Sequence, residues 1–177
     1  WDVDLNYLKL LENDLSTRVG KNAAAILLNA LRINSWTLSS YFNDYAGSVS
    51  LTGDYGNGSK GFATRFWDII GVRAVKDMLS IPDLASARYS VQRYDSLLAQ
   101  QKNSNAEITR AAEMARPTSE KEAKELNDTV NLMRLWTLFF EGRMRLIEAV
   151  ASAHQNGEES QIRAKLDSAI DLSKSML

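Results

Sequence analysis

The sequence predicts an all-α protein, an antiparallel bundle of about five to six helices with one long, irregular, glycine-rich loop. Apolar residues recur every three or four positions over most of the chain, which is the period of an amphipathic helix. No segment keeps the two-residue alternation that is typical of a half-buried strand. Only two prolines occur, and five of the nine glycines lie between residues 47 and 61, so long helices can form on both sides of that segment.

Two helices are expected before the loop. The first extends from Asp2 to Val19 with leucines along one face, including Leu8, and Gly20 is expected to end it. The second extends from about Asn22 to Tyr45 and begins with three alanines, whose small side chains allow a neighbouring helix to approach closely. Because the connection is short and both helices are long, an antiparallel hairpin is expected.

Residues 47–61 are expected to form an irregular loop, because glycine, serine, asparagine and aspartate favour turns. A short helix from Phe62 to Gly71 should follow, with a continuation from Val72 to Leu79. Pro82 biases the residue before it away from helical geometry and therefore marks a break. Asp83 is well placed to cap the next helix by accepting backbone N–H bonds.

Two long helices are expected next. The first spans about Leu84 to Arg116, and the polar stretch from Gln100 to Asn105 interrupts its apolar stripe, so a bend or a division is expected there. The second spans Ser119 to about Gln155 and has the clearest apolar seam of the chain, with Trp136 among its core residues. Asn156-Gly157 is expected to end it.

A final helix from Glu158 to Met176 turns an apolar set inward that includes Ile162, Leu166 and Ile170. No domain boundary is visible, so residues 1–177 are expected to form a single helical-bundle domain. The chain starts at Trp1 without an initiator methionine, which suggests a fragment of a larger multidomain protein.

Composition narrows the classes of function. The 21 basic and 22 acidic residues leave a formal charge of -1, which argues against a nucleic-acid partner. No apolar run approaches the ~18 residues of a membrane span, so no membrane partner is expected. The chain has no cysteine and a single histidine, His154, so we expect no thiol nucleophile, no metal site and no cofactor.

The glycine-rich loop holds the best candidate contact residues. Tyr55 cannot easily join a core from this loop and is therefore the first candidate for contact with a ligand or a neighbouring domain. Asp54 and Asn57 could offer oxygen atoms to a calcium ion, although the spacing of an EF-hand is absent. Gly56 to Gly61 matches the three-glycine dinucleotide pattern, but no strand precedes it, so a nucleotide site is not predicted.

No catalytic residue is assigned. Glu141 and Glu148 share the predicted helix at 119–155, but paired acids for glycoside hydrolysis need a concave pocket between them, of which the sequence shows no sign. The spacing of Glu141 and Arg145 is instead typical of an ion pair on a solvated helix face.

Both ends of the chain resemble a recurring helical tract of large glycoside hydrolases. Residues 1–5, 15–20 and 23–25 resemble the Trp-x-x-Asp-Leu start, the Arg-x-Gly turn and the alanine-rich second helix that follow the catalytic barrel in those enzymes. Residues 125–129 and 132–149, with the Asn-Gly break and the closing helix, are also similar. Helical regions of this type occur in α-glucuronidases and in hyaluronidase-like β-N-acetylglucosaminidases.

The resemblance implies a C-terminal accessory domain of a secreted glycoside hydrolase, periplasmic or extracellular, although no signal peptide is visible in this chain. It also implies that the catalytic carboxylates lie in the barrel, so the helical chain itself is expected to be non-catalytic. Its partner would be the catalytic domain of the same polypeptide, which it would support, and the 47–61 loop would lie near the glycan cleft.

A free-standing helical module that binds another protein is the main alternative. An enzyme built on the bundle itself would need acids that converge from several helices.

Overall fold

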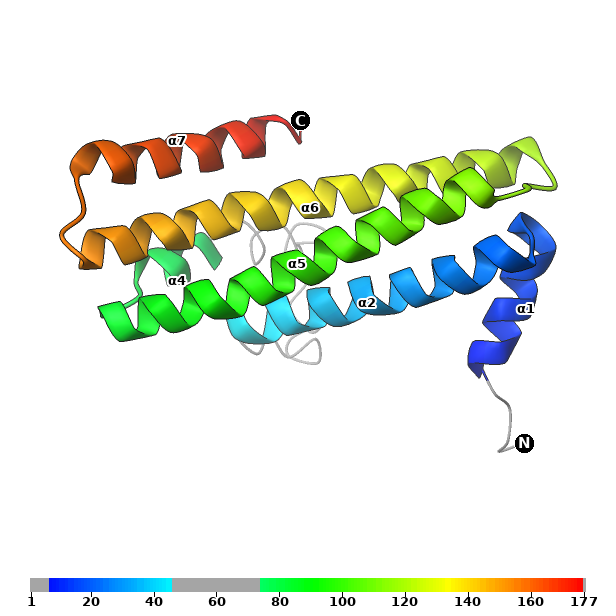
Figure 1. The fold of residues 1–177 in the computed structure, drawn as a ribbon, viewed down its shortest axis with the longest axis horizontal. Coiled ribbons are helices and arrows are strands. Elements are labelled where there is room, and N and C mark those ends of the chain that lie inside the picture. Colours follow the sequence, from blue (N-terminus) through cyan, green and yellow to red (C-terminus); the bar gives the residue numbers. More distant parts are fainter. Residues whose placement is uncertain (1–6, 46–73, 177) are drawn as a thin grey trace, which may run out of the picture. The chain divides into compact units, whose positions relative to one another are not determined.

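The computed structural model describes residues 7–45 and 74–176, and every regular element within these ranges is an α-helix (Figure 1). The all-α prediction is therefore confirmed. The helices in chain order are α1 (Tyr7–Val19), α2 (Lys21–Tyr45), α4 (Ala74–Leu79), α5 (Leu84–Met114), α6 (Glu120–His154) and α7 (Glu159–Lys174). The predicted loop at 47–61 and the predicted helix at 62–71 lie outside the described residues.

The chain divides into two compact units, and three long helices contribute to both. Unit 1 contains α1, α2 through Trp36, α5 from Ala99 and α6 through Thr137. Unit 2 contains the remaining parts of these three long helices together with α4 and α7. Each unit therefore has a framework of three long helices, to which α1 is added in unit 1 and α4 and α7 in unit 2.

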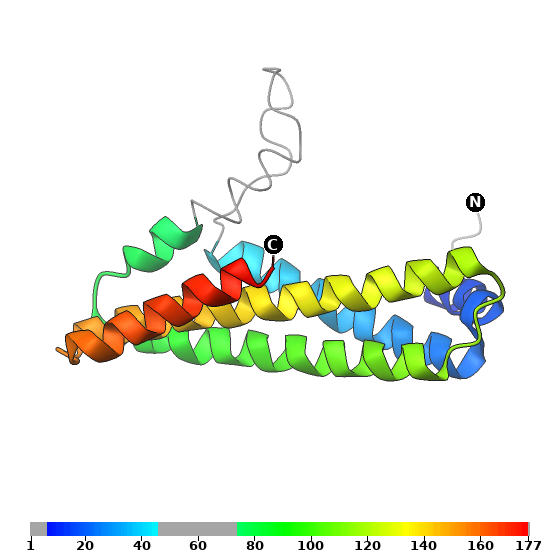
Figure 2. The ribbon, with the colours of Figure 1, turned by 90° about the horizontal axis from the view of Figure 1, so that it is seen from above.

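Gly20 makes a one-residue connection between α1 and α2. Its φ of 90° lies in the left-handed region that favours glycine, and its N–H donates to the carbonyl of Ser16 at 3.1 Å. The predicted end of the first helix is therefore confirmed. The predicted hairpin is wrong: α1 crosses α2 steeply, as the two views of Figures 1 and 2 show. A single residue is too short to reverse the chain, since antiparallel helix pairs use loops of about 2–5 residues.

The core of unit 1 consists of small and aliphatic side chains. Alanines on α2 and α5 allow the two helix backbones to approach closely, as the alanine-rich start of α2 predicts. Trp136 packs against this core and is half-buried. The buried members are Val19, Ala23, Ala24, Leu27, Ala30, Ile108, Ala111, Ala115, Leu126 and Met133.

The polar stretch from Gln100 to Asn105 does not divide α5. Ser104 is fully buried, and its hydroxyl donates to the carbonyl of Ala30 on α2 at 2.8 Å. Gln101 is also fully buried, and its side-chain N–H donates weakly to the sulfur of Met133 on α6 at 4.0 Å. Because buried polar groups are tolerated when neighbouring helices supply partners, α5 continues without a break, and the expected division is wrong.

The connection between α5 and α6 is anchored on the end of α1. The N–H of Arg116 donates to the carbonyl of Val19 at 2.8 Å, and the N–H of Thr118 donates to the carbonyl of Arg18 at 3.2 Å. The guanidinium of Arg18 also pairs with Glu122 and Glu125 at the start of α6. These bonds connect three segments of unit 1 that are far apart in sequence.

The start of α6 is capped from the same connection. The hydroxyl of Ser119 accepts a bond from the N–H of Glu122 at 3.3 Å, as expected of a helix N-cap. The hydroxyl of Thr118 donates to the Glu122 carboxylate, and this bond contributes most to lowering the pKa of Glu122. The predicted start of this helix at residue 119 is therefore confirmed to within one residue.

Unit 2 is centred on four aromatic rings from its three long helices. Tyr41 of α2 makes edge-on contacts with Tyr94, Phe139 and Phe140 at centroid distances of 6.0, 5.4 and 5.5 Å. The guanidinium of Arg143 lies 4.8 Å from the centroid of the Phe139 ring. Because three helices contribute rings to one cluster, the cluster fixes their positions within this unit.

Two capping structures set the boundaries of the helices in unit 2. Asp83 caps α5 as predicted, because its carboxylate accepts the N–H of Ser86 at 2.8 Å, and this backbone bond is the main cause of its lowered pKa. At the end of α6, Asn156 has a φ of 54°, and the N–H of Gly157 donates to the carbonyl of Ser152 at 2.9 Å. This is a Schellman motif, so the predicted Asn-Gly stop is confirmed.

The buried hydroxyl of Ser104 provides a test of the interior of unit 1. Replacement of Ser104 by alanine is expected to lower the free energy of unfolding by about 1 kcal/mol relative to Ser96→Ala, because it removes the bond to α2. Ser96 is exposed on the same helix, so this control subtracts the difference in helix propensity. Urea denaturation of both variants measures the difference. Equal stabilities would show that the bond to Ala30 contributes nothing.

The aromatic cluster predicts a pH dependence of stability. Burial raises the pKa of Tyr41 to about 12, against the opposing effect of Arg143, whereas the unfolded chain titrates near 10. The folded state therefore holds this proton more tightly, and stability is expected to fall by about 2–3 kcal/mol as the pH rises from 10 to 12.

Denaturation curves at several alkaline pH values test this dependence. Tyr41→Phe keeps the ring and removes the proton, so its stability should fall less steeply over the same pH range. Tyr89→Phe, which changes an exposed tyrosine of α5, is the matched control and should behave as the parent chain. Parallel curves for the parent chain and Tyr41→Phe would contradict the assignment.

Candidate functional site

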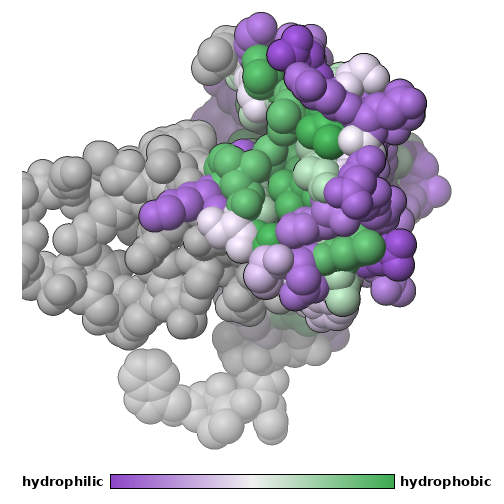
Figure 3. Space-filling view, turned by 90° about the vertical axis from the view of Figure 1, so that its left-hand side faces the viewer, coloured by the Kyte–Doolittle hydropathy of each residue, from purple (hydrophilic) through white to green (hydrophobic). Residues whose placement is uncertain are grey.

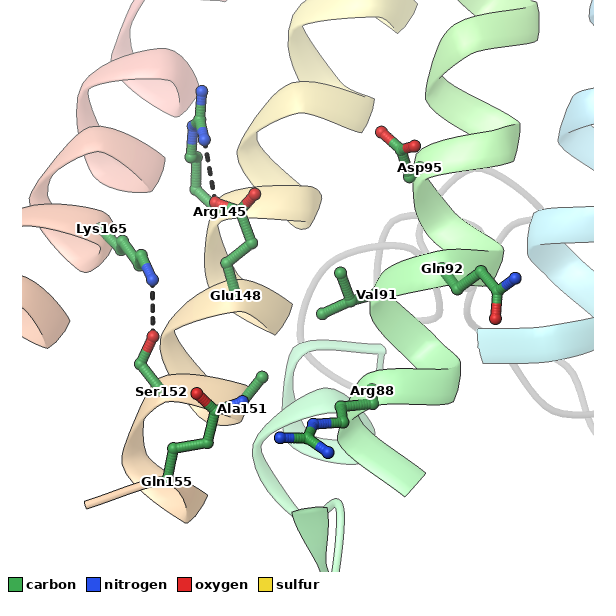
Figure 4. Close-up of a pocket in the computed structure, with 10 residues that line it drawn as sticks. All are labelled: Arg88, Val91, Gln92, Asp95, Arg145, Glu148, Ala151, Ser152, Gln155 and Lys165. Carbon is green, nitrogen blue, oxygen red and sulfur yellow. Dashed lines mark hydrogen bonds and ion pairs between the residues drawn. The ribbon is translucent and has the colours of Figure 1, made fainter. Parts of the chain in front are cut away.

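A groove of about 560 Å³ opens on unit 2 between α5, α6 and α7 (Figure 4). One wall comes from α5 and consists of Arg88, Val91, Gln92 and Asp95. The opposite side comes from α6 and the residue that follows it, and consists of Arg145, Glu148, Ala151, Ser152 and Gln155. Lys165 of α7 completes the lining. Intervals of three and four residues on both long helices place each set on one helix face.

The floor of the groove is apolar and its rim is polar. Val91 is half-buried and Ala151 is buried, whereas Arg88, Asp95 and Arg145 are exposed. Apolar groups below and charged groups above are a common arrangement in sites that bind small polar molecules.

Arg88 and Lys165 line the groove from opposite sides of the last turns of α6. Figure 4 shows the guanidinium of Arg88 on one side and the ammonium of Lys165 on the other, with Ser152 and Gln155 between them. The Lys165 ammonium donates to the hydroxyl of Ser152 at 2.5 Å.

Carboxylates gather at the other end of the groove. Asp95 lies seven residues after Arg88 on α5, which corresponds to about 10 Å along the helix. Across from Asp95, Glu148 forms an ion pair with Arg145 at 2.8 Å (Figure 4). Arg88 and Asp95 therefore lie two helical turns apart on the same wall of the groove.

Arg88 and Asp95 are the two charged groups of the lining that have no partner among the described residues. Neither forms an ion pair or a hydrogen bond with another residue in the part of the chain that the structure describes. Arg145, Glu148 and Lys165 already have partners within the groove. A ligand would therefore meet one uncompensated cation at one end and one uncompensated carboxylate at the other.

The position of α7 depends on a close approach to α6 at Gly142. A Cβ at this position would lie 3.6 Å from the carbonyl oxygen of Ala169 and 3.7 Å from the Cβ of Leu172. None of the residues of α7 is buried. Ile170 is exposed, so the prediction that the Ile170 side chain turns inward is wrong. The apolar stripe of α7 is only partly covered because this helix packs on the outside of unit 2, along α6 (Figure 2).

A second notable surface lies on α1. Tyr7, Leu8 and Leu10 are 66%, 43% and 48% exposed, although the sequence predicts that Leu8 belongs to an inward stripe. Leu11 lies on the same side of the helix and is half-buried. The steep crossing at Gly20 directs the start of α1 away from α2, which explains this exposure. We call Tyr7, Leu8 and Leu10 the α1 apolar surface.

Unit 2 also exposes apolar side chains at the end where α5 and α7 begin. Figure 3 shows hydrophobic groups on this face between hydrophilic ones. Leu79 at the end of α4 is exposed, and Ile81 and Leu84 are half-buried. The imidazole of His154 forms a hydrogen bond with the carbonyl of Ile81 at 2.9 Å, which holds the α4–α5 connection against the end of α6.

The candidate contact residues predicted from the sequence, Tyr55, Asp54 and Asn57, lie outside the described residues. Of the paired acids considered from the sequence, Glu148 lines the groove and Glu141 does not. Within the described ranges, no group of three or more His, Cys, Asp or Glu side chains is placed to bind a metal ion.

No helix in the described part of the chain is both long enough and apolar enough to cross a membrane.

Comparison of the chain with family models, with curated proteins and with solved structures found no match. The resemblance to glycoside hydrolases therefore stays a prediction, and a functional proposal has to be argued from the arrangement of the described residues.

Sequence reasoning missed the groove because its lining comes from three helices. Arg88 and Asp95 are spaced by two helical turns, which is a visible signal that they share a face of α5. Nothing in the sequence shows that this face lines one groove with Ser152 and Lys165, because that arrangement depends on how α5 packs beside α6 and how α7 folds back along α6.

Gly142 provides a test of the docking of α7. Gly142→Ala is expected to raise the free energy of unfolding by about 0.5–1 kcal/mol, since a methyl group fits at ordinary contact distances and alanine favours the helix. Gly142→Leu is expected to displace α7, because a longer side chain would collide with Ala169 and Leu172. Hydrogen exchange of the α7 amides measures the docking. Unchanged α7 protection in Gly142→Leu would show that the contact does not hold this helix.

Proposed function

We propose that this chain is a non-catalytic helical accessory domain of a secreted glycoside hydrolase, which packs against the catalytic domain of the same polypeptide and supports it. The observation that carries the proposal is the α1 apolar surface. The resemblance of residues 1–5, 15–20, 23–25, 125–129 and 132–149 to helical regions that follow catalytic barrels supplies the kind of partner.

The α1 apolar surface has the properties of a docking site. Its three large side chains lie in the first turn of α1, where Tyr7 stands between Leu10 and Leu8 and the set spans about 160° of the helix circumference. All three are more than two-fifths exposed. Full burial of a leucine side chain contributes about 1.5–3 kcal/mol, so a partner that covers this surface would be bound by several such contributions. Contiguous exposed apolar residues of this kind are typical of interaction surfaces.

The attachment of α1 to the rest of unit 1 would hold in place a domain that docks on the α1 apolar surface. At its other end, α1 is bonded to the α5–α6 connection through Val19 and Arg18. A domain packed on Tyr7, Leu8 and Leu10 would therefore be held against unit 1 through a helix that is anchored on α6. The proposed mechanism is structural: the bundle limits the movement of the catalytic domain and of the loops that shape its glycan cleft.

The gene upstream of Trp1 provides the first test. The proposal expects it to encode a catalytic barrel in the same reading frame. A complete short gene would contradict the proposal and favour the free-standing interaction module. Turnover of aryl glycosides by the isolated chain would contradict the non-catalytic assignment.

The double variant Leu8→Glu and Leu10→Glu, made in the protein that includes the upstream domain, tests the docking surface. Charged groups on this surface are expected to lower the Tm of the catalytic domain by about 2–4 °C for each kcal/mol of lost contact. Differential scanning calorimetry measures this change. Leu132→Glu is the matched control, because Leu132 is 49% exposed on α6 of the same unit. Equal effects of the double variant and the control would exclude α1 as the docking site.

A further inference from the structure

We infer that Asn156 is a deamidation site whose reaction is gated by the docking of α7, and that its conversion to isoaspartate releases α7 from α6. The inference does not depend on the proposed accessory role, because it uses only α6, α7 and the turn between them.

The turn after α6 requires the two residue types that make this reaction possible. Asn156 has a φ of 54°, a conformation that asparagine, aspartate and glycine tolerate better than other residues. A Cβ at position 157 would lie 2.9 Å from the carbonyl oxygen of Ser152, so this position requires glycine. Glycine also leaves the backbone nitrogen of residue 157 without steric protection from a side chain. The geometry of the turn therefore selects a labile Asn-Gly pair, and Asn156 is exposed to solvent.

The reaction needs no reagent other than water. The backbone nitrogen of Gly157 loses its proton to solvent base and attacks the side-chain carbonyl carbon of Asn156. A carbon–nitrogen bond forms, the bond to the side-chain nitrogen breaks, and this nitrogen leaves as ammonia with a proton from solvent. Water then opens the cyclic imide at one of its two carbonyl groups, which gives aspartate or isoaspartate. No step requires an oxidant or a reductant.

The folded turn opposes the first step. The N–H of Gly157 donates to the carbonyl of Ser152 at 2.9 Å, and a carbonyl oxygen is too weak a base to take the proton. Attack also turns the face of this peptide group toward the Asn156 side chain, which the same bond resists. The N–H of Asn156 donates to the carbonyl of Ala153 at 3.1 Å and holds the preceding peptide group as well. Asn156 is therefore expected to react only when the turn opens.

Opening of the turn is coupled to the docking of α7. The turn directs the chain back along α6, where Ala169 and Leu172 approach Gly142. The Lys165 ammonium of α7 donates to the hydroxyl of Ser152 at the end of α6. Because α7 has no buried residue, its local opening is expected to cost less free energy than global unfolding. The deamidation rate should therefore follow the fraction of molecules in which α7 is undocked.

Both products disfavour the docked helix. Isoaspartate places an additional methylene group in the main chain, so the N–H of residue 157 no longer matches the position of the Ser152 carbonyl. Aspartate keeps the backbone and adds a negative charge beside the last carbonyls of α6, where negative charge is unfavourable. Because the ammonia is lost, the change does not reverse. Isoaspartate therefore removes the turn that holds α7 along α6.

Peptide mapping by mass spectrometry of the full chain, incubated at mildly alkaline pH, tests the site. In urea, Asn156 is expected to react as fast as Asn57, which also precedes a glycine. Without urea, the reaction at Asn156 is expected to be at least about tenfold slower than in urea, because only molecules with an open turn react. Labelling with an isoaspartyl methyltransferase identifies the isoaspartate product.

Two substitutions at one position test the gate. Gly142→Leu, which is expected to displace α7, should raise the rate at Asn156 without urea toward the rate in urea. Gly142→Ala is the matched control and should not raise this rate. Hydrogen exchange of the α7 amides in the same samples measures the docking, and exchange of the α5 amides confirms that the rest of the chain is folded.

A third variant tests the release of α7. Asn156→Gly keeps the positive φ and has no side-chain amide, so its α7 protection should be unchanged after incubation. In the parent chain, α7 protection should fall as isoaspartate accumulates.

Three kinds of result would overturn the inference. The first is an equal rate at Asn156 with and without urea, or no reaction there in urea while Asn57 reacts. The second is a rate at Asn156 that does not follow the exchange of the α7 amides across the parent chain and the two Gly142 variants. The third is unchanged α7 protection in a chain converted to isoaspartate.

Discussion

The backbone at Gly20 is the constraint on which unit 1 depends. Its left-handed conformation ends α1 and starts α2 within a single residue, so α1 must cross α2 instead of lying along it. The crossing brings the last carbonyls of α1 to the α5–α6 connection, where Arg116 and Thr118 donate to them. The same crossing leaves the first turns of α1 without a neighbour from α2. The anchor and the exposed apolar surface are therefore two results of one backbone geometry.

Unit 2 is organised differently, because side chains rather than a turn determine its arrangement. Four aromatic rings from three helices form its centre, with edge-on contacts that need defined ring orientations. The three long helices are held by this cluster, and α7 is added outside it along α6 without any buried residue. A well-packed centre with a loosely covered outer helix leaves space for a groove at their boundary, and five charged residues of the unit line that groove.

Most helix boundaries could be predicted from the sequence, because they depend on local chemistry. Gly20, Asp83 and Asn156 act through their own backbone conformation or through bonds to residues a few positions away. The continuity of α5 could not be predicted, because it depends on the bond that Ser104 makes to α2 and on the burial of Gln101 beside Met133 of α6. The direction of α1, the exposure of Ile170 and the lining of the groove are also products of tertiary packing. Each of these predictions failed where a contact between distant segments outweighed the local pattern.

The absence of any buried residue in α7 has a thermodynamic consequence for the groove. Segments with little buried apolar surface open at a lower free energy than the rest of a protein, so α7 is expected to be among the first elements to unfold locally. The lining of the groove is complete only while α7 is docked, because Lys165 is part of it. Occupation of the groove and local folding of α7 are therefore linked equilibria, and a molecule that binds there would also stabilise the docked helix.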